Sequence, residues 1–268
     1  MRLSELGTPD APVRLSSLSR LQCCPGFFVL GDERCGVVGD THSQAADTGT
    51  AFHRMAELFH EDPERSFAEI IEQTAEESGG ASGRPFPLAD LPLAGKWFLP
   101  YTRDPRNECD TPYLETRVRL EVDDVVFLGH LDQIRVGDGD RLEVWDIKTG
   151  RDSGCDQIYK YAWQQAGYVL AAAETLGEDV WPGGIITPRA YCVRTKPAPG
   201  DARVHCRTPW GIRACEEMMT RVAAMIRRIR DGKIELFPGK HCNWCPGVSP
   251  SSCGGDLELL FTGEMSHE

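Results

Sequence analysis

The chain has 268 residues, of which 41% are hydrophobic and 26% charged, so it can bury a sizeable core as one large domain or as one domain with a small annex. Acidic residues outnumber basic ones by 41 to 29, and a net charge of −12 excludes a generally basic coat for nucleic acid. Any contact with DNA must therefore be local or assisted by a metal ion. No apolar run approaches the roughly 20 residues that cross a bilayer, and the start, "MRLSELGTPDAPVRL", lacks the apolar centre of a secretory signal. These features predict a cytoplasmic protein without membrane contact.

The first part of the chain is expected to be helical. The stretch "VRLSSLSRLQCCPGFF" (13–28) predicts a serine-capped helix that ends at Pro25 and Gly26. "AADTGTAFHRMAELFHE" predicts a second helix with apolar residues at helical spacing, and residues 62–80 predict its acidic continuation. Residues 81–111, rich in Pro, Gly and Asp, predict an irregular connection.

Three β-strand patterns follow, and they predict an antiparallel meander with "GDGD" between its last two strands. The strands are expected at 113–122, 124–136 and 141–150. A helix at 156–177, a strand at 183–194 and a long helix at 209–232 come next. The last helix carries five arginines that could follow phosphates, although a solvated basic face is the simpler interpretation. The tail "GKHCNWCPGVSPSSCGG" predicts a cysteine-bearing loop.

The stretch "LEVWDIKTG" (142–150) places two opposite charges, Asp146 and Lys148, on one face of a strand, because side chains two residues apart point to the same side. Asp132, in "GHLDQI", belongs to the preceding strand. An even-length loop at residues 137–140 would set Asp132 opposite Trp145, on the wrong face, so we predict an odd-length loop or a bulge. A surface ion pair between Asp146 and Lys148 is the simpler alternative.

Two adjacent carboxylates suit Mg²⁺ or Mn²⁺, which prefer oxygen ligands and bind alongside substrate phosphates. The ammonium group of Lys148 could position or deprotonate an attacking water while the metal ion stabilises charge on the phosphoryl oxygens. The strand pattern therefore indicates metal-dependent hydrolysis of a phosphodiester.

Four motifs, "GTAFH" on a helix, "GHLD", "WDIK" and "QQAGY" on the next helix, occur in that order. Together they resemble the PD-(D/E)XK nuclease superfamily in its RecB-like branch, which includes CRISPR-associated and phage iron–sulfur exonucleases. The resemblance implies that His53, Asp132 and Asp146 bind the metal ion, and that Lys148 is catalytic together with the two aspartates. Asp146 stands where Glu is commoner in this superfamily.

The resemblance also implies that Gln164 and Tyr168 support DNA binding and the active site. They lie one helical turn apart and share a face, which equally fits a core tyrosine with a polar neighbour. His53 could likewise be a helix residue without a ligand. Glu115, in "YLETRV", could add a further carboxylate, although a solvated strand acid is the simpler interpretation.

Eleven cysteines in the reducing compartment expected here indicate metal ligation rather than a disulfide framework. The tail offers three thiolates that can converge on one site, namely Cys242, Cys245 and Cys253. A closed site needs a fourth ligand. The resemblance implies that "CCPG" supplies it, with Cys24 preferred to Cys23, and that the site holds a [4Fe–4S] cluster. Zn²⁺, held by four cysteines or with His241 in place of one, is the physical alternative.

We therefore expect an α/β fold with a restriction-endonuclease-like core, a central mixed β-sheet flanked by helices, and a small iron–sulfur annex formed by both termini. The whole chain, 1–268, is expected to be one nuclease domain. Within it, 13–28 and 240–256 form the cluster-binding annex, 43–80 a helical segment and 113–194 the catalytic core.

The resemblance implies a metal-dependent exonuclease that acts on DNA ends or single strands in recombination, repair or phage DNA processing. A helicase, a recombination or CRISPR protein, or a second copy of the chain is its expected partner. One alternative is a non-catalytic DNA-binding or scaffold subunit of a helicase–nuclease assembly, against which the intact set of Asp132, Asp146 and Lys148 argues. The other alternative is a zinc-stapled endonuclease.

Overall fold

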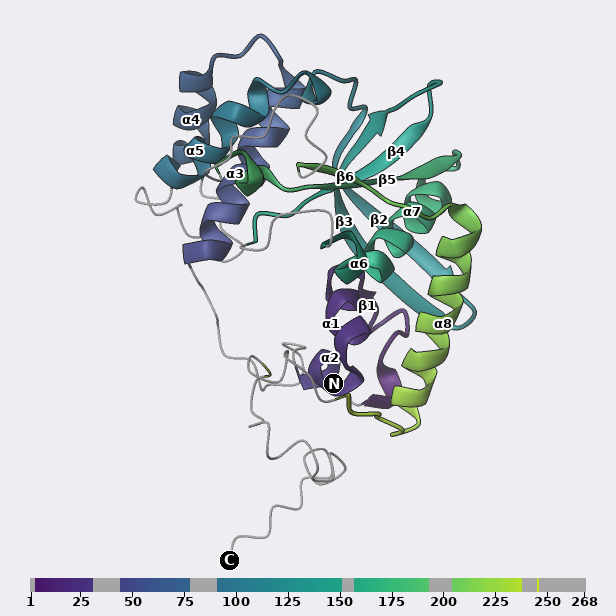
Figure 1. The fold of residues 1–268 in the computed structure, drawn as a ribbon. Coiled ribbons are helices and arrows are strands. Elements are labelled where there is room, and N and C mark those ends of the chain that lie inside the picture. Colours follow the sequence, from purple (N-terminus) through teal and green to yellow (C-terminus); the bar gives the residue numbers. More distant parts are fainter. Residues whose placement is uncertain are drawn as a thin grey trace, which may run out of the picture.

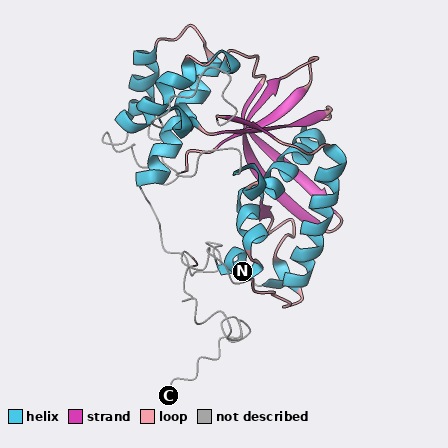
Figure 2. Cartoon of the chain, viewed as in Figure 1, coloured by secondary structure: helices cyan, strands magenta, loops and turns pink. Residues whose placement is uncertain are grey.

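The computed structural model describes residues 3–30, 44–77, 91–150, 157–192 and 204–237, together with Cys245. A six-stranded sheet lies at the centre, with helices on both sides of it (Figures 1 and 2). The strands are β1 (Val13–Arg14), β2 (Tyr113–Val122), β3 (Val125–Val136), β4 (Leu142–Ile147), β5 (Val180–Ile186) and β6 (His205–Arg207). The helices are α1 (Leu18–Cys23), α2 (Pro25–Leu30), α3 (Gln44–Glu61), α4 (Phe67–Glu76), α5 (Leu91–Thr102), α6 (Gln157–Lys160), α7 (Ala162–Leu176) and α8 (Ile212–Arg230).

The sheet is mixed, as expected. Its order is β1-β3-β4-β5-β6, and β2 also pairs with β3. The meander β2-β3-β4 is antiparallel, whereas β1 runs parallel to β3 and β4 runs parallel to β5. The parallel pair β4 and β5 is joined through α7, because parallel neighbours need a crossover connection. An α/β fold with a mixed central sheet flanked by helices is thus confirmed.

The connection between β3 and β4 has an odd number of residues, which confirms the prediction of register. The amide of Gly137 donates to the carbonyl of Arg141 (2.8 Å), so three residues, 138–140, form the loop. Gly139 and Asp140 adopt positive φ angles of 70° and 58°, as residues of such tight loops do. Ladder pairs run as far as Gln133 with Trp145, and one further step sets Asp132 opposite Asp146.

Each face of the sheet has its own apolar core. On one face, Val118, Phe127 and Val144 pack with α1, α7 and α8. On the other face, Trp145 and Ile147 pack with α3 and α5. Figure 1 shows α3, α4 and α5 gathered on one side of the sheet and α7 and α8 on the other. The charged side chains Asp132 and Asp146 therefore belong to central strands of a sheet that is covered on both faces.

Two expectations about the helices are wrong. Residues 81–111 are not simply an irregular connection, because α5 (Leu91–Thr102) lies within them, with Leu91, Ala94 and Phe98 buried at helical spacing. Its first-turn proline is compatible with a helix start, because that position needs no amide donor. Pro25 likewise begins α2 instead of ending a helix, and Val13–Arg14 form a strand.

Other boundaries differ more modestly. The acidic stretch 62–80 contains a separate helix, α4, which starts at a capping box between Ser66 and Glu69. The helix expected at 156–177 is divided at Tyr161, and β5 ends at Ile186 instead of reaching residue 194. In the expected annex, 13–28 forms β1, α1 and part of α2, whereas 240–256 lies outside the described residues apart from Cys245. In the described part of the chain, no helix is long and apolar enough to span a membrane.

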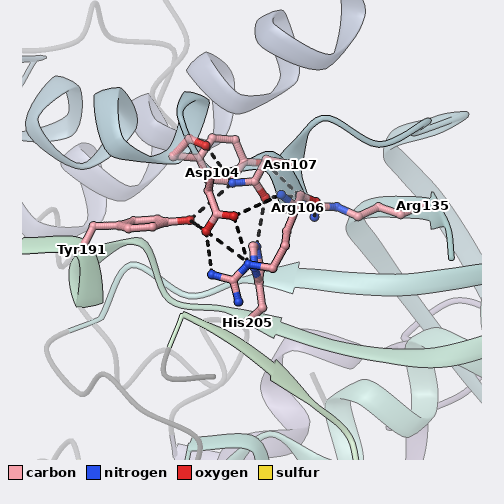
Figure 3. A network of polar contacts seen from close by, with 7 residues as sticks. Asp104, Arg106, Asn107, Arg135, Tyr191 and His205 are labelled. Atoms are coloured by element: carbon pink, nitrogen blue, oxygen red, sulfur yellow. Dashed lines mark hydrogen bonds and ion pairs between the residues drawn. The ribbon is translucent and has the colours of Figure 1, made fainter. Parts of the chain in front are cut away.

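A buried polar network attaches the end of α5 and the 3-10 helix Pro105–Asn107 to the sheet (Figure 3). Asp104 accepts hydrogen bonds from Arg106 and from the Tyr191 hydroxyl (2.7 Å). Asn107 Oδ1 accepts from Arg135 on β3 (3.0 Å) and from His205 on β6 (3.0 Å). The helical layer that carries α3 is therefore bonded to two strands of the sheet and does not merely rest on it.

Candidate metal centre

Three different elements bring metal-ligand atoms together at Asp132, within β3. His53 lies on α3, Glu115 on β2 and Asp132 on β3, and their ligand atoms all lie within 4.8 Å of one another. His53 Nδ1 is 3.3 Å from Asp132 Oδ1 and 3.7 Å from Glu115 Oε1. Because α3 is far from the strands in sequence, only packing of α3 on the sheet produces this group.

The spacing fits one small divalent ion. Two ligands bound to an ion at about 2.1 Å are separated by about 3.0 Å at right angles and about 4.2 Å across it. The two separations from His53 Nδ1, 3.3 and 3.7 Å, fall inside this range. An imidazole nitrogen with carboxylate oxygens suits Mn²⁺, and the carboxylates also suit Mg²⁺.

Glu115 is the ligand candidate for which the sequence favoured a solvated role. Its φ angle is 41°, in the left-handed region that a bulky residue rarely adopts. The residue interrupts the β2–β3 ladder between the pairs Leu114 with Gln133 and Thr116 with Leu131. Its side chain therefore turns toward His53. Nothing in the strand pattern "YLETRV" signals this distortion, so only the register opposite Asp132 could have pointed to it.

Asp146 lies next to this group with a different set of partners. Its side chain is buried, and Oδ2 is 2.7 Å from the ammonium nitrogen of Lys148. Its Oδ1 accepts a hydrogen bond from Gln164 Nε2 on α7 (3.3 Å). Asp132 is held close by because its Oδ2 accepts from the backbone amide of Ile147 (2.5 Å). The three-atom ligand group thus consists of His53, Glu115 and Asp132, with Asp146 directed toward Lys148.

The site opens into a cavity of about 760 Å³. Asp132, Asp146, Lys148, Gln164 and Tyr168 line its inner part. Gly129, in the motif "GHLD", allows this arrangement, since a Cβ atom there would lie 2.6 Å from the Tyr168 ring. The Gln164 and Tyr168 pair on α7 therefore faces the carboxylates.

Mutual charge interactions shift the pKa values of the site. Burial alone would lower the pKa of His53, but the carboxylates of Asp132 and Glu115 outweigh it and raise that pKa to about 10. Burial raises the pKa of Asp146 to about 6 against the opposing charge of Lys148. Burial opposes the charge of Lys148, yet Asp146 and Asp132 raise the pKa of its ammonium group above the usual value. The neighbouring carboxylates thus raise the pKa values of His53 and Lys148, whereas burial is the main cause of the raised pKa of Asp146.

Lys148 has a second neighbour besides Asp146. Its ammonium nitrogen lies 4.7 Å from the ring centroid of Tyr161, where the negative face of the ring attracts a cation. Tyr161 stands at the break between α6 and α7. The lysine is thus a fixed positive charge beside the carboxylates rather than a mobile surface group.

The cysteines are only partly described. Cys24 is buried, and its Sγ accepts a hydrogen bond from the backbone amide of Phe237 (3.4 Å). The two ends of the described chain therefore meet at the "CCPG" motif. Cys245 is half-buried, whereas Cys242 and Cys253 lie outside the described residues.

The family model of the PD-(D/E)XK nuclease superfamily matches residues 15–249 of the chain. The chain belongs to the PD-(D/E)XK nuclease superfamily. The matched range contains α3, the meander and α7, which carry His53, Asp132, Asp146, Lys148 and the Gln164–Tyr168 pair. The chain is accordingly a nuclease of this superfamily, whose members typically use divalent metal ions and whose substrate is DNA.

Among solved structures, the chain is similar to a "putative exonuclease" from Eubacterium rectale, with a TM-score of 0.52 and 14% sequence identity. The alignment covers 87% of this chain and 86% of that one, so it shows a shared fold over nearly the whole length. No curated protein matches the chain in a sequence comparison.

Proposed function

We propose that this PD-(D/E)XK protein is a divalent-metal-dependent deoxyribonuclease that degrades DNA from ends or single strands during recombination, repair or phage DNA processing. The observation that carries the proposal is the meeting, where the end of β4 lies beside β3, of two carboxylates, an imidazole and an ammonium group. A sheet with only a structural role would not need to gather four ionisable side chains at one place.

In this proposal His53, Asp132 and Asp146 hold Mg²⁺ or Mn²⁺, with Glu115 as a further carboxylate. The ion would stabilise the charge that develops on the phosphoryl oxygens. Lys148 stays protonated at neutral pH because neighbouring carboxylates raise its pKa. In that state it supplies a positive charge that orients the attacking water and the phosphate. Gln164 fixes the position of Asp146 through the hydrogen bond to Oδ1.

The exonuclease mode is supported by the shared fold with the Eubacterium rectale protein, which is itself described as an exonuclease. The cavity beside the carboxylates is lined by residues of β1, β2, β3, β4 and α7. Cleavage of a single strand at or near its end is the simplest use of this geometry.

We also propose a [4Fe–4S] cluster bound by Cys24, Cys242, Cys245 and Cys253. The contact of Phe237 with Cys24 supports this proposal. Phe237 lies four residues before the motif "HCNWC", so the segment that leads to the downstream cysteines starts beside the upstream cysteine. The cluster would supply a covalent closure between the two ends of the domain. Zn²⁺ in the same ligand set is the alternative, and absorbance near 400 nm after anaerobic purification would distinguish iron from zinc.

The test uses end-labelled single- and double-stranded DNA with Mg²⁺ or Mn²⁺. The native protein is compared with Lys148→Ala and Asp146→Asn, and Lys233→Ala, at an exposed position just after α8, serves as the control. We expect the first two substitutions to reduce hydrolysis by about 100-fold or more, since each removes a charge that stabilises the transition state. The size of the labelled fragments shows whether cleavage starts at ends. Degradation that survives both substitutions would place the chemistry elsewhere, and a wild type without activity would favour the scaffold alternative.

A further inference from the structure

Beyond the metal centre, the cavity continues to a gap in the sheet. β2 pairs with β3 along its length, so β1 and β4 must share the opposite edge of β3. β4 pairs with β3 from Gln133 to Val136, and β1 pairs at Phe127 and Leu128. Between these two ladders, no described strand pairs with residues 129–132 on that edge. The cavity lies at this gap, with Gly129, His130 and Asp132 in its lining.

The outer part of the cavity is basic. Arg14 from β1, Arg117 from β2 and His130 from β3 line it, together with Ser16. Among the described lining residues, carboxylates occur only at the metal centre, as Asp132 and Asp146. In a chain where acidic residues outnumber basic ones by 41 to 29, this separation of charge is local. It places positive charge where a strand would leave the metal centre.

Arg117 is oriented by a hydrogen bond to His130 on the neighbouring strand. Its Nε donates to His130 Nε2 (3.1 Å), and in the described part of the chain this is its one polar contact. The hydrogen bond fixes the histidine tautomer, so Nδ1 carries the proton. The two Nη groups of Arg117 and the Nδ1–H of His130 are therefore donors available for oxygen atoms of a ligand.

Several other arginines of the described chain are paired with acids. Arg119, two residues further along β2, pairs with Glu121 (2.7 Å) and Glu174 (3.7 Å). On α8, Arg227 and Arg230 pair with Asp124, and Arg228 pairs with Glu235. The basic face that the sequence allowed on α8 is thus largely engaged within the protein, whereas Arg117 has no carboxylate partner in the described chain.

We infer that this groove, formed by Arg14, Ser16, Arg117 and His130, binds the phosphodiester backbone of the DNA strand on one side of the bond that is cut. The inference deepens the proposed nuclease function and rests on it. At about 3.4 Å per strand residue, Arg117, opposite His130, stands roughly 7 Å and Arg14, opposite Leu128, roughly 14 Å from Asp132 along β3. Both residues therefore lie along the path that a strand takes from the metal centre, beside the phosphates that neighbour the one that is cut. The contacts are to phosphates, so binding is independent of sequence.

Binding is measured by fluorescence anisotropy with a labelled oligothymidine in Ca²⁺, on the full chain, with the oligonucleotide checked for integrity on a gel. Arg117→Ala and Arg14→Ala are compared with Arg119→Ala, which removes the same charge from the same strand outside the groove. We expect each groove variant to weaken binding roughly fivefold or more. We also expect each to reduce the slope of log K against log salt by about 0.7, the value for one lost phosphate contact on a single strand. Arg119→Ala should leave both unchanged.

A second arm locates the contact. A single uncharged methylphosphonate linkage is moved along the oligothymidine, and the wild type should lose affinity when it replaces one of the phosphates that neighbour the cut on the groove side. Arg117→Ala should be insensitive to one of these positions. Circular dichroism melting confirms that each variant is folded, and Arg14→Ala and Arg117→Ala test the groove independently of each other.

The two proposals fail in different ways. In one outcome, the wild type hydrolyses DNA, and both groove variants show the same affinity and the same salt dependence as Arg119→Ala. That result would overturn the proposed phosphate-binding groove and leave the nuclease function intact. A wild type that does not hydrolyse DNA with Mg²⁺ or Mn²⁺ would overturn the nuclease function, whatever the anisotropy shows. In steady-state kinetics the groove variants should raise KM and leave kcat within about twofold, because Arg14 and Arg117 bind the strand away from the reacting phosphate.

Discussion

Asp146 depends on its hydrogen-bond partner on α7 as much as on its own strand. Its carboxylate is buried, one oxygen faces Lys148, and the other accepts from Gln164. Groups that orient a metal ligand commonly change metal affinity 10- to 100-fold when they are lost. The neighbouring residue, Gln165, is also buried, but its amide has no hydrogen-bond partner in the described part of the chain. Comparing substitutions of the two glutamines therefore distinguishes two effects: the loss of a hydrogen bond to the proposed ligand Asp146, and the loss of a buried amide.

Replacing Gln164 by Leu should weaken Mn²⁺ binding by roughly 10- to 100-fold, measured by titration calorimetry. Gln165→Leu should bind Mn²⁺ like the wild type and should be as stable or more stable, because it removes an unpaired buried amide. Equal Mn²⁺ affinities for the wild type and Gln164→Leu would show that Asp146 is not a ligand or does not need this support.

Gly129 separates β3 from the Tyr168 ring, and a Cβ atom at this position would lie 2.6 Å from that ring and 3.0 Å from Leu15. Gly129→Ala should therefore destabilise the protein by about 1 to 3 kcal/mol in urea denaturation, the usual cost of overpacking. Gly150→Ala is the matched control, since nothing lies within 4 Å of its Cβ position. A Gly129→Ala variant as stable as Gly150→Ala would mean that Tyr168 does not pack against β3.

The part of the site that depends on side-chain alternation along strands and on loop length could be predicted from the sequence. Asp132, Asp146 and Lys148 could be placed together because side chains alternate along strands and an odd loop sets the register. Glu115 could not be assigned to the site, since a positive φ angle in a non-glycine strand residue leaves no mark in the sequence. The basic groove was also missed, because Arg14, Arg117 and His130 converge only through strand pairing between distant segments.

The orientation of helix α3 is fixed two turns beyond His53, at His60. Tyr101 of α5 lies 2.7 Å from His60 Nε2, and its hydroxyl accepts hydrogen bonds from Gln133 and Arg135 of β3. The hydroxyl proton is therefore left for His60 Nε2, and His60 Nδ1 donates to Thr111 (3.2 Å). Since His60 and His53 lie seven residues apart on one face of α3, this bonding also sets the position of His53.

Helix α5 shows why the fold was not wholly predictable. Its sequence "LPLAGKWFLPYT" contains two prolines and a glycine, which normally indicate a connection. The apolar spacing of Leu91, Ala94, Phe98 and Tyr101 was present, but the helix is stable because both the α3 layer and the sheet network cover it. Tertiary packing thus overrides local propensity here.

The buried neutral state of His60 predicts a stability that depends on pH. Burial, followed by the charge of Arg135, lowers its pKa to about 3 in the folded protein, below the usual 6.5. The unfolded chain therefore binds the additional proton, and the contribution of His60 to stability is lost as pH falls from about 6.5 toward 3. The loss is at most about 1.4 kcal/mol per pH unit.

The measurement is urea denaturation of wild type and His60→Gln between pH 7.5 and 4.5. Asp146, whose folded pKa is raised to about 6, acts in the opposite direction over part of this range, so the difference between the two proteins is the relevant quantity. The free energy of unfolding of His60→Gln should be lower than that of the wild type at pH 7.5, and this difference should become smaller as pH falls. Thr111→Val, which keeps the histidine, should show a deficit nearly constant with pH, and equal behaviour of the two variants would contradict the prediction.

At the scale of the whole molecule, the first and last elements of the described chain are joined by contacts of their own. Phe237, after α8, donates its amide to Cys24 between α1 and α2, so the end of the described chain returns to its beginning. α8 is fixed at the same end, since Arg230 pairs with Asp124 and bonds to the carbonyl of Leu6. A cluster at Cys24 would strengthen a closure that packing has already begun.

Cys24→Ala should therefore lose bound metal and melt at a lower temperature, while hydrolysis by the remaining folded protein is retained at low temperature. Elemental analysis for iron and zinc and a thermal melt measure the two effects. Cys215→Ala, in the α8 core, is the control that should lower stability without changing the metal content. An unchanged metal content in Cys24→Ala would remove Cys24 from the ligand set.

The central claim is that His53, Asp132 and Asp146 hold one divalent cation beside Lys148. Anomalous diffraction from crystals grown with Mn²⁺ tests it most directly. The proposal predicts one strong peak within bonding distance of His53 Nδ1 and of carboxylate oxygens of Asp132 and Asp146, which disappears in Asp132→Asn crystals. A peak elsewhere, or no peak at this site at saturating Mn²⁺, would contradict the claim.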